Sequence, residues 1–310
     1  MLELDLMSDQ FFERYECPAC GHKHIKTIFR RRFDDPLVQD YLSIEYPSAK
    51  NMIFPSEIFF DVSVCLRCEL HFQRYVFKEE CVGRVYNDWM DQDAALEDHV
   101  NNGLWKIEYY KKILKYAASY LKKLPEQISF LDYGAGFGAS LEVASEMGFK
   151  VHAIEYSEAR IAYLKSKGIQ AFNGFHNGRY DFIICDQVLE HVTHPNELIK
   201  SIGQLLAPNG LLYLAVPNCV NIRKKLLRAE CISNPIAYHA ALANASIGAF
   251  QHINFFNNMS LTNLIRNNGL QPFLSLRLSF SSPITLKNFL RPFYHRYFST
   301  VFFVKKTADR

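Results

Sequence analysis

Apolar and polar positions change their period along the chain, and these changes mark the elements that the sequence predicts. From Trp105 to Leu124, aromatic and aliphatic residues recur at helical spacing between lysines, which indicates an amphipathic helix packed on a domain. After Pro125, short apolar runs alternate with helical segments. The apolar runs are residues 128–134, 150–157, 168–172, 180–186 and 211–217. Strands that are apolar on both faces and alternate with helices predict a parallel sheet covered by helices.

The end of the chain departs from this alternation. Residues 259–270 predict a helix that ends at a glycine, and residues 270–279 and 297–306 are two β-rich runs with no clear helix between them. We therefore expect an antiparallel pair of strands at one edge of the sheet. Residues 218–256 contain several basic and small residues and predict an excursion over the mouth of the sheet.

Composition places the chain among globular proteins. Its 310 residues allow about two domains, and 49% hydrophobic against 22% charged residues disfavours disorder. A net charge of +3 is too small to argue for a nucleic-acid partner. No apolar run reaches the roughly 18 residues of a membrane span, and the N-terminal segment is acidic where a signal peptide is basic. We therefore expect a cytoplasmic protein with no membrane partner.

Four of the eight cysteines form two Cys-x-x-Cys pairs, Cys17 with Cys20 and Cys65 with Cys68. Four thiolates are a complete tetrahedral set for a structural Zn²⁺ ion. The 44 residues between the pairs exceed the usual spacing of about 15–20, so the intervening stretch must be an insertion that folds. One alternative is a mixed set that includes a flanking histidine. Another is that the cysteines hold no metal or have a redox role. The flanking histidines are His22, His24 and His71.

A glycine-rich turn carries the main chemical signal. Gly134, Gly136 and Gly138 follow a predicted strand and precede a helix, so backbone can approach a ligand there. The turn alone also fits a dinucleotide fingerprint. Glu155, at the end of the next strand, would accept hydrogen bonds from two ribose hydroxyls. Asp132, just before the glycines, would repel a pyrophosphate but suits a ligand with a cationic amino-acid end.

The segment 128–217 resembles a class I S-adenosylmethionine-dependent methyltransferase of the small-molecule branch. DYGAGFG matches the glycine motif of that family, and YDFIICDQVLEHVTHP and APNGLLYLAVPN resemble its fourth- and fifth-strand segments. The cysteine pairs look like the zinc-binding module that precedes some sugar and natural-product methyltransferases. The resemblance implies a Rossmann-like, seven-stranded α/β sheet with a small N-terminal zinc-binding module.

The resemblance also implies roles for individual residues. Asp132 and the three glycines would hold the methionine moiety of the cofactor, and Glu155 the ribose. Tyr156 would cover one adenine face, with packing in the core as the alternative, while Asp186 and Gln187 would lie beside the sulfonium. A general base is a separate question, for which His191 and His252 are the candidates. His194, Tyr238 and His239 are weaker ones, and catalysis by proximity alone stays open.

The sequence thus predicts three parts: residues 1–85 as a zinc-binding module with an insertion, 86–125 as a helical linker, and 126–310 as the methyltransferase domain. We expect methyl transfer from S-adenosylmethionine to a small polar metabolite, such as a nucleotide-linked sugar or a biosynthetic intermediate. One alternative is an RNA or protein methyltransferase that uses the zinc module as a reader. Another is a nicotinamide-dependent oxidoreductase. A scaffold with a decayed site is disfavoured because Asp132 and Glu155 are both present.

Overall fold

The computed structural model describes residues 10–47, 54–85, 103–174, 176–273 and 299–306, with isolated positions between 86 and 102. By packing, the chain forms two units, and both are discontinuous in sequence. The N-terminal unit comprises Met1–Asp91, Leu189–Asn196 and Pro217–Asn263. The sheet unit comprises Gln92–Val188, Glu197–Val216 and Leu264–Arg310. The division at residues 85 and 125 that the sequence suggests stays a prediction.

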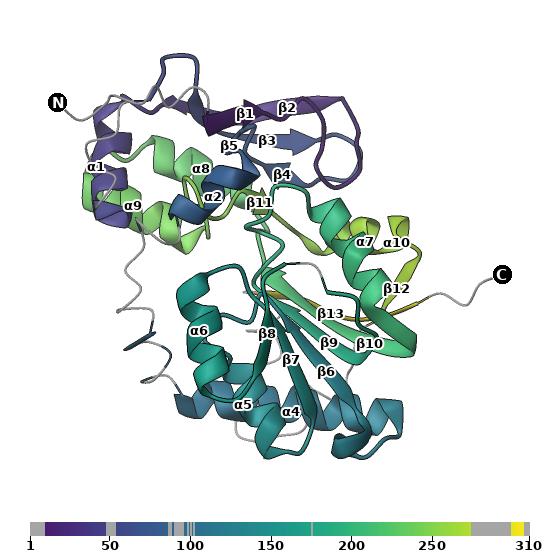
Figure 1. Ribbon diagram of the computed structural model, residues 1–310. Helices are drawn as coiled ribbons and strands as arrows, with labels where there is room; N and C mark the ends of the chain where they lie inside the picture. Colours follow the sequence, from purple (N-terminus) through teal and green to yellow (C-terminus); the bar gives the residue numbers. More distant parts are fainter. Residues whose placement is uncertain are drawn as a thin grey trace, which may run out of the picture. The chain divides into compact units, whose positions relative to one another are not determined.

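The sheet unit contains a seven-stranded sheet with the order β12-β13-β10-β9-β6-β7-β8 (Figure 1). The strands are β6 (Ser129–Tyr133), β7 (Lys150–Ile154), β8 (Gln170–Phe172), β9 (Tyr180–Asp186), β10 (Leu206–Pro217), β12 (Leu270–Phe273) and β13 (Ser299–Lys306). The pairs from β10 through β9, β6 and β7 to β8 are parallel, and β12 pairs with β13 antiparallel. The predicted α/β sheet with an antiparallel edge is confirmed, although residues 274–279 and 297–298 of the two β-rich runs lie outside the described residues.

Helices precede the first of these strands or lie between successive strands along the chain. They are α4 (Gly103–Leu121), the short η4 (Pro125–Gln127), α5 (Ala139–Glu146), α6 (Glu158–Ser166), α7 (Pro195–Leu205) and α10 (Asn258–Asn267). Helix α4 buries Ile113, Leu114 and Ala117 in one hydrophobic core with residues of α5 and of the strands, among them Phe130 and Phe182. The middle of the apolar stripe seen in the sequence is therefore the face that α4 turns to the core, whereas Tyr120 is exposed and Leu124 lies beyond the end of the helix.

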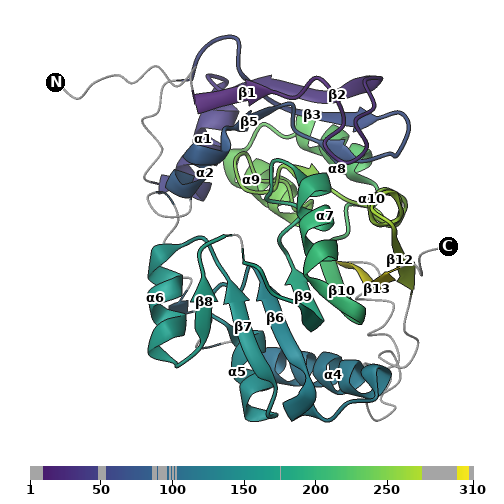
Figure 2. The ribbon, with the colours of Figure 1, turned by 45° about the vertical axis from the view of Figure 1, so that its right-hand side comes forward.

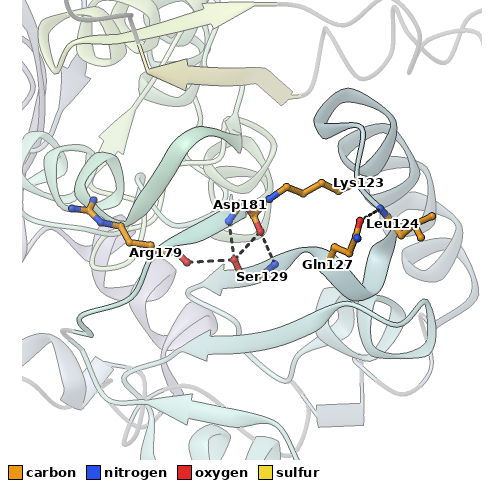
Figure 3. A network of polar contacts seen from close by, with 6 residues as sticks. All are labelled: Lys123, Leu124, Gln127, Ser129, Arg179 and Asp181. Carbon is orange, nitrogen blue, oxygen red and sulfur yellow. Dashed lines mark hydrogen bonds and ion pairs between the residues drawn. The ribbon is translucent and has the colours of Figure 1, made fainter.

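A polar network fixes the amino ends of the two central strands (Figure 3). The Asp181 carboxylate, near the start of β9, accepts hydrogen bonds from the backbone N–H and the hydroxyl of Ser129, both at 3.0 Å. Lys123, just after α4, lies 2.8 Å from the other carboxylate oxygen. These contacts join the amino ends of β6 and β9. Asp132 and Asp186 lie at the opposite, carboxyl ends, which are the ends where open α/β sheets bind ligands.

The N-terminal unit combines segments that are far apart in the sequence (Figure 2). Its sheet has the order β11-β4-β3-β2, and β1 pairs with β5. Its elements are β1 (Phe11–Glu13), β2 (Ile25–Arg32), α1 (Pro36–Glu45), β3 (Phe59–Cys65), β4 (His71–Phe72), β5 (Tyr75–Phe77), α2 (Glu79–Arg84), α8 (Ile222–Glu230), α9 (Pro235–Asn244) and β11 (Asn254–Phe255). None of the helices in the described ranges combines the length and apolar character needed to cross a membrane.

The insertion between the cysteine pairs folds around an antiparallel pair, β2 with β3, followed in space by β4. The fourth strand of this sheet, β11, comes from the far end of the chain, with Asn254 opposite Phe72. Helices α8 and α9 share a hydrophobic core with α1 and β3, in which Tyr41, Phe60 and Tyr238 are fully buried. Residues 217–263 are therefore part of the N-terminal unit, although in sequence they follow the strands of the sheet unit.

Candidate functional site

The turn between β6 and α5 requires glycine at two positions. Gly134 and Gly138 have φ angles of 78° and 85°, and a Cβ on either would lie 2.5 Å from a side-chain carbon of Val188 or Leu164, respectively. Gly136 has a φ of 57° with no atom within 4 Å of the position of a Cβ. The first and third glycines therefore allow close packing, and the second leaves open space beside the backbone.

Glu155 follows β7 and joins that strand to the glycine turn. Its carboxylate accepts a hydrogen bond from the backbone N–H of Gly136 at 2.7 Å. The other oxygen accepts from the N–H groups of Tyr156 and Ser157, at 2.8 and 2.9 Å. The Glu155 side chain is thus fixed by three N–H donors at the turn. The neighbouring Tyr156 is 58% exposed, and its hydroxyl lies 3.1 Å from that of Tyr133.

Two more acids, Asp132 on β6 and Asp186 on β9, lie at the carboxyl ends of neighbouring strands. Asp132 is only 6% exposed, and this burial raises its pKa to about 7. The hydroxyl of Ser140 donates a hydrogen bond to the Asp132 carboxylate, which partly offsets the rise in pKa. The negative charges of Asp186 and Glu155 add to the rise. Desolvation also raises the pKa of Asp186, to about 6. Carboxylates whose charged form is disfavoured in this way gain from a cationic ligand.

Three tyrosines surround Asp186, and sequence reasoning missed their role. The hydroxyl of Tyr110 donates to the Asp186 carboxylate at 3.2 Å, which opposes the rise in its pKa. The hydroxyls of Tyr109 and Tyr213 lie 2.5 Å apart. Tyr110 is 76 residues from its partner, so no local pattern in the sequence points to it. Gln187 is exposed and has a φ of 57°. Its side-chain Nε2 lies 3.5 Å from Oδ1 of Asp186.

In the N-terminal unit, the four predicted cysteines form one cluster. The sulfurs of Cys17 and Cys68 lie 3.5 Å apart and those of Cys20 and Cys65 lie 3.6 Å apart. All four ligand atoms lie within 4.8 Å of one another. Four sulfurs at about 2.3 Å from a tetrahedral Zn²⁺ are about 3.8 Å apart, so the cluster fits this ion. The flanking histidines lie outside the cluster of four.

The two cysteine pairs have the same backbone turn. In each, the residue after the second cysteine has a positive φ, 65° at Gly21 and 60° at Glu69. Its N–H donates to the carbonyl of the first cysteine of the pair, at 2.8 Å for Cys17 and 3.1 Å for Cys65. N–H groups of Arg67 and Cys68 also point to the Cys65 sulfur, at 3.4 and 3.5 Å. N–H donors of this kind stabilise thiolates.

The two candidate bases, His191 and His252, also lie in the N-terminal unit, with ring centroids 4.7 Å apart. Together with the buried Glu190 they form a second group whose ligand atoms all lie within 4.8 Å. Burial lowers the pKa of His252. The weaker candidates lie elsewhere: Tyr238 is fully buried in the core, while His239 pairs with Glu45 and His194 stacks on Phe12.

A buried arginine holds the segment that contains His252. Arg14 is 5% exposed and donates to the backbone carbonyls of Gln73 and Ile253, at 2.8 and 2.9 Å. It also donates to the side-chain carbonyl of Asn254 at 2.9 Å. The Asn254 amide in turn donates to the carbonyls of residues 189 and 192, at 2.9 and 2.7 Å. Arg14 and Asn254 thus bind the two histidine segments to the strand that follows the second cysteine pair.

Comparison with known proteins shows the family to which the chain is similar. Residues 105–274, more than half of the chain, match the family model described as a methyltransferase domain. This range contains the glycine turn, Glu155 and both histidines, and it leaves out the cysteine cluster.

Among curated relatives, the C-methyltransferase NovU of Streptomyces niveus is 23% identical over 67% of this chain and 49% of its own length. A ubiquinone biosynthesis O-methyltransferase of Xanthomonas euvesicatoria is 25% identical over 60% of this chain and 76% of its own length. The match thus spans about half of NovU. Magnesium protoporphyrin IX methyltransferase from Synechocystis PCC 6803, solved with bound SAH, aligns with a TM-score of 0.46 at 14% identity, covering 72% of this chain and 92% of that one.

Proposed function

Since the chain belongs to the methyltransferase-domain family, we propose that it transfers a methyl group from S-adenosylmethionine to a small polar metabolite. An acceptor such as a nucleotide-linked sugar or a biosynthetic intermediate is the class that we favour. The relatives named C-methyltransferase and ubiquinone biosynthesis O-methyltransferase support a small-molecule acceptor, with carbon and oxygen both open as the methylated atom.

One observation carries the proposal: acidic side chains at the carboxyl ends of the strands lie beside the glycine turn, and Glu155 is hydrogen-bonded to it. The N–H of Gly136 holds the Glu155 carboxylate at the turn, where it would bind the ribose hydroxyls. Asp132 and residues 134–138 would hold the methionine moiety. The ammonium group of that moiety would favour the ionised form of Asp132, whose pKa burial has raised to about 7. Tyr156 would cover the adenine, and Asp186 with Gln187 would lie beside the sulfonium.

When bound, the cofactor supplies a methyl group on a good leaving group. The chain therefore needs mainly to orient the acceptor, and orientation alone can contribute about 7–11 kcal/mol to the lowering of a barrier. For a hydroxyl or carbon acceptor, a proton must also be removed. We propose His191 and His252 as the groups that act on the acceptor, because they are paired and carried on two segments that Asn254 joins.

Calorimetry with S-adenosylhomocysteine tests the cofactor site. We expect Glu155→Ala and Asp132→Ala each to lower the affinity at least 100-fold, since charged hydrogen bonds to the ligand are lost. Glu158→Ala is the matched control, because Glu158 is an exposed acid in the first turn of α6 and makes none of these contacts. Affinities of the first two variants equal to that of the wild type contradict the proposed site.

We also propose that Cys17, Cys20, Cys65 and Cys68 hold a structural Zn²⁺. The sulfur distances and the paired backbone turns support this, and burial of three of the four residues favours a closed, structural site. Metal analysis of the purified chain should give at least one zinc per molecule, and Cys68→Ser should lose the zinc bound at the cysteines. Cys231→Ser is the control, since Cys231 is exposed and lies outside the cluster. Wild-type protein with much less than one zinc contradicts the assignment.

A further inference from the structure

We propose that Glu190, His191 and His252 form a second metal site, which binds a divalent transition-metal ion. One carboxylate oxygen and one nitrogen from each ring lie within 4.8 Å of one another. The three residues all belong to the N-terminal unit, and none of them is part of the cysteine cluster. Two imidazoles and one carboxylate are a ligand set used for zinc and for ferrous iron in proteins.

The backbone sets the ring nitrogens for metal binding. Nδ1 of His191 lies 3.1 Å from the carbonyl of Gln251, and Nδ1 of His252 lies 3.0 Å from that of Ser246. A carbonyl can only accept, so each Nδ1 carries a proton. In the neutral imidazole, Nε2 then has the lone pair that a metal ion needs. Metal-bound histidines typically have this second hydrogen bond, because it fixes the tautomer and the ring orientation.

The peptide segments that carry the three ligands are joined before any ion binds. The backbone carbonyl of Glu190 accepts from the N–H groups of Ile253 and Asn254, at 2.8 and 3.0 Å. The Asn254 side chain binds the same turn on both sides of His191, through the carbonyls of residues 189 and 192. The site is therefore preorganised, so little conformational freedom is lost on binding.

One of the three ligands is buried and another is partly exposed, as expected for a metal site that a substrate can reach. The Glu190 side chain is 2% exposed, whereas that of His191 is 21% exposed. A buried carboxylate next to two imidazole rings gains strongly from a bound cation. Three protein ligands leave at least one coordination position for water or a substrate oxygen, as in catalytic rather than structural sites.

The site would change how the two histidines act on an acceptor, a consequence that rests on the proposed function. With both Nε2 lone pairs on the metal, the histidines do not take up the acceptor proton themselves. A hydroxyl bound to the metal has a lowered pKa and loses its proton to solvent more readily. The acceptor class would then be compounds with a hydroxyl or enolisable carbonyl that can bind a metal.

Cobalt binding to the full chain, already loaded with zinc at the cysteines, tests the proposal. We expect one Co²⁺ per chain to bind with visible d–d absorption and without the near-ultraviolet band of cobalt bound to thiolate. Glu190→Gln and His252→Asn should each weaken this binding at least tenfold. His239→Asn is the matched control, because it removes the histidine of another histidine–glutamate pair, with Glu45, in the same unit.

His191→Gln provides a second test if a variant of the buried Glu190 does not fold, since His191 is partly exposed and its replacement leaves the core intact. Retained zinc shows that each variant is folded. The proposal is wrong if the wild-type chain takes up no Co²⁺ beyond the cysteine cluster at 1 mM metal, or if His191→Gln and His252→Asn bind it as tightly as the wild type. Affinity for S-adenosylhomocysteine, measured without cobalt, tests the proposed function separately.

Discussion

Replacement of Asp132 by asparagine separates stability from cofactor binding. Asparagine has the shape of aspartate and can still accept the hydrogen bond that Ser140 donates, but it carries no charge. The side chain at this position is only 6% exposed, so the change removes a charge from the protein interior without making a cavity. We expect the variant to be more stable than the wild type at alkaline pH and to bind S-adenosylhomocysteine poorly.

The size of the gain follows from the pKa of Asp132, which burial raises from 3.8 to about 7. Below pH 3.8 the carboxyl is protonated in both the folded and the unfolded chain, and its ionisation has no effect on stability. Between pH 3.8 and 7 only the unfolded chain loses the proton, so the folded state becomes progressively less favoured. Above pH 7 the full difference of about 4 kcal/mol applies, since one pKa unit is about 1.4 kcal/mol.

Urea unfolding of wild type and Asp132→Asn at pH 4.5 and pH 8.5 measures this difference. We expect a stability gain of about 2–4 kcal/mol at pH 8.5 and about 1 kcal/mol at pH 4.5. Calorimetry at pH 8.5 should show at least a 100-fold loss of affinity for S-adenosylhomocysteine. A variant that is no more stable at pH 8.5 than at pH 4.5, relative to wild type, refutes the argument from desolvation, and an unchanged affinity refutes the role of the carboxylate.

Three further predictions concern the turn, the buried arginine and the tyrosine beside Asp186. Gly138→Ala should lower the free energy of unfolding by about 1–3 kcal/mol, and more than Gly136→Ala, because only the first adds a steric clash to a positive φ; urea unfolding compares them. Arg14→Met should lower it by about 3 kcal/mol or more, because buried carbonyls lose their donor, and should speed hydrogen exchange in residues 251–254. Tyr110→Phe removes a hydrogen bond that lowers the pKa of Asp186, so the Asp186 carboxylate should become protonated at a higher pH than in the wild type. As the pH is lowered from 8 to 5, the affinity of the variant for S-adenosylmethionine should therefore start to fall earlier, which calorimetry measures.

Predictions that depend on local pattern were the ones that the structure confirmed. The alternation of apolar runs and helices predicted the order of strands and helices from β6 to β10, because each element is recognised within about ten residues of chain. The four cysteines come together as the two Cys-x-x-Cys pairs suggested, despite the long stretch between the pairs. The positive φ angles at Gly134 and Gly138 likewise follow from a turn that only glycine fits.

Features that depend on contacts between distant residues could not be read from the sequence. Asn254 forms part of β11 because its partner strand, β4, lies about 180 residues earlier in the chain, and nothing near Asn254 indicates this. Arg14 looks like any surface arginine in the sequence, yet it is buried and bound to Ile253 and Asn254. Tyr110 follows Tyr109 in an amphipathic helix, so its contact with Asp186 depends on how α4 packs.

A parallel titration of the full chain with S-adenosylhomocysteine and with NAD⁺ tests the central claim most directly, since the glycine turn alone would suit either ligand. We predict that S-adenosylhomocysteine binds with one molecule per chain and a dissociation constant in the micromolar range or tighter, and that NAD⁺ gives no heat of binding under the same conditions. Binding of NAD⁺ with no binding of S-adenosylhomocysteine would contradict the account.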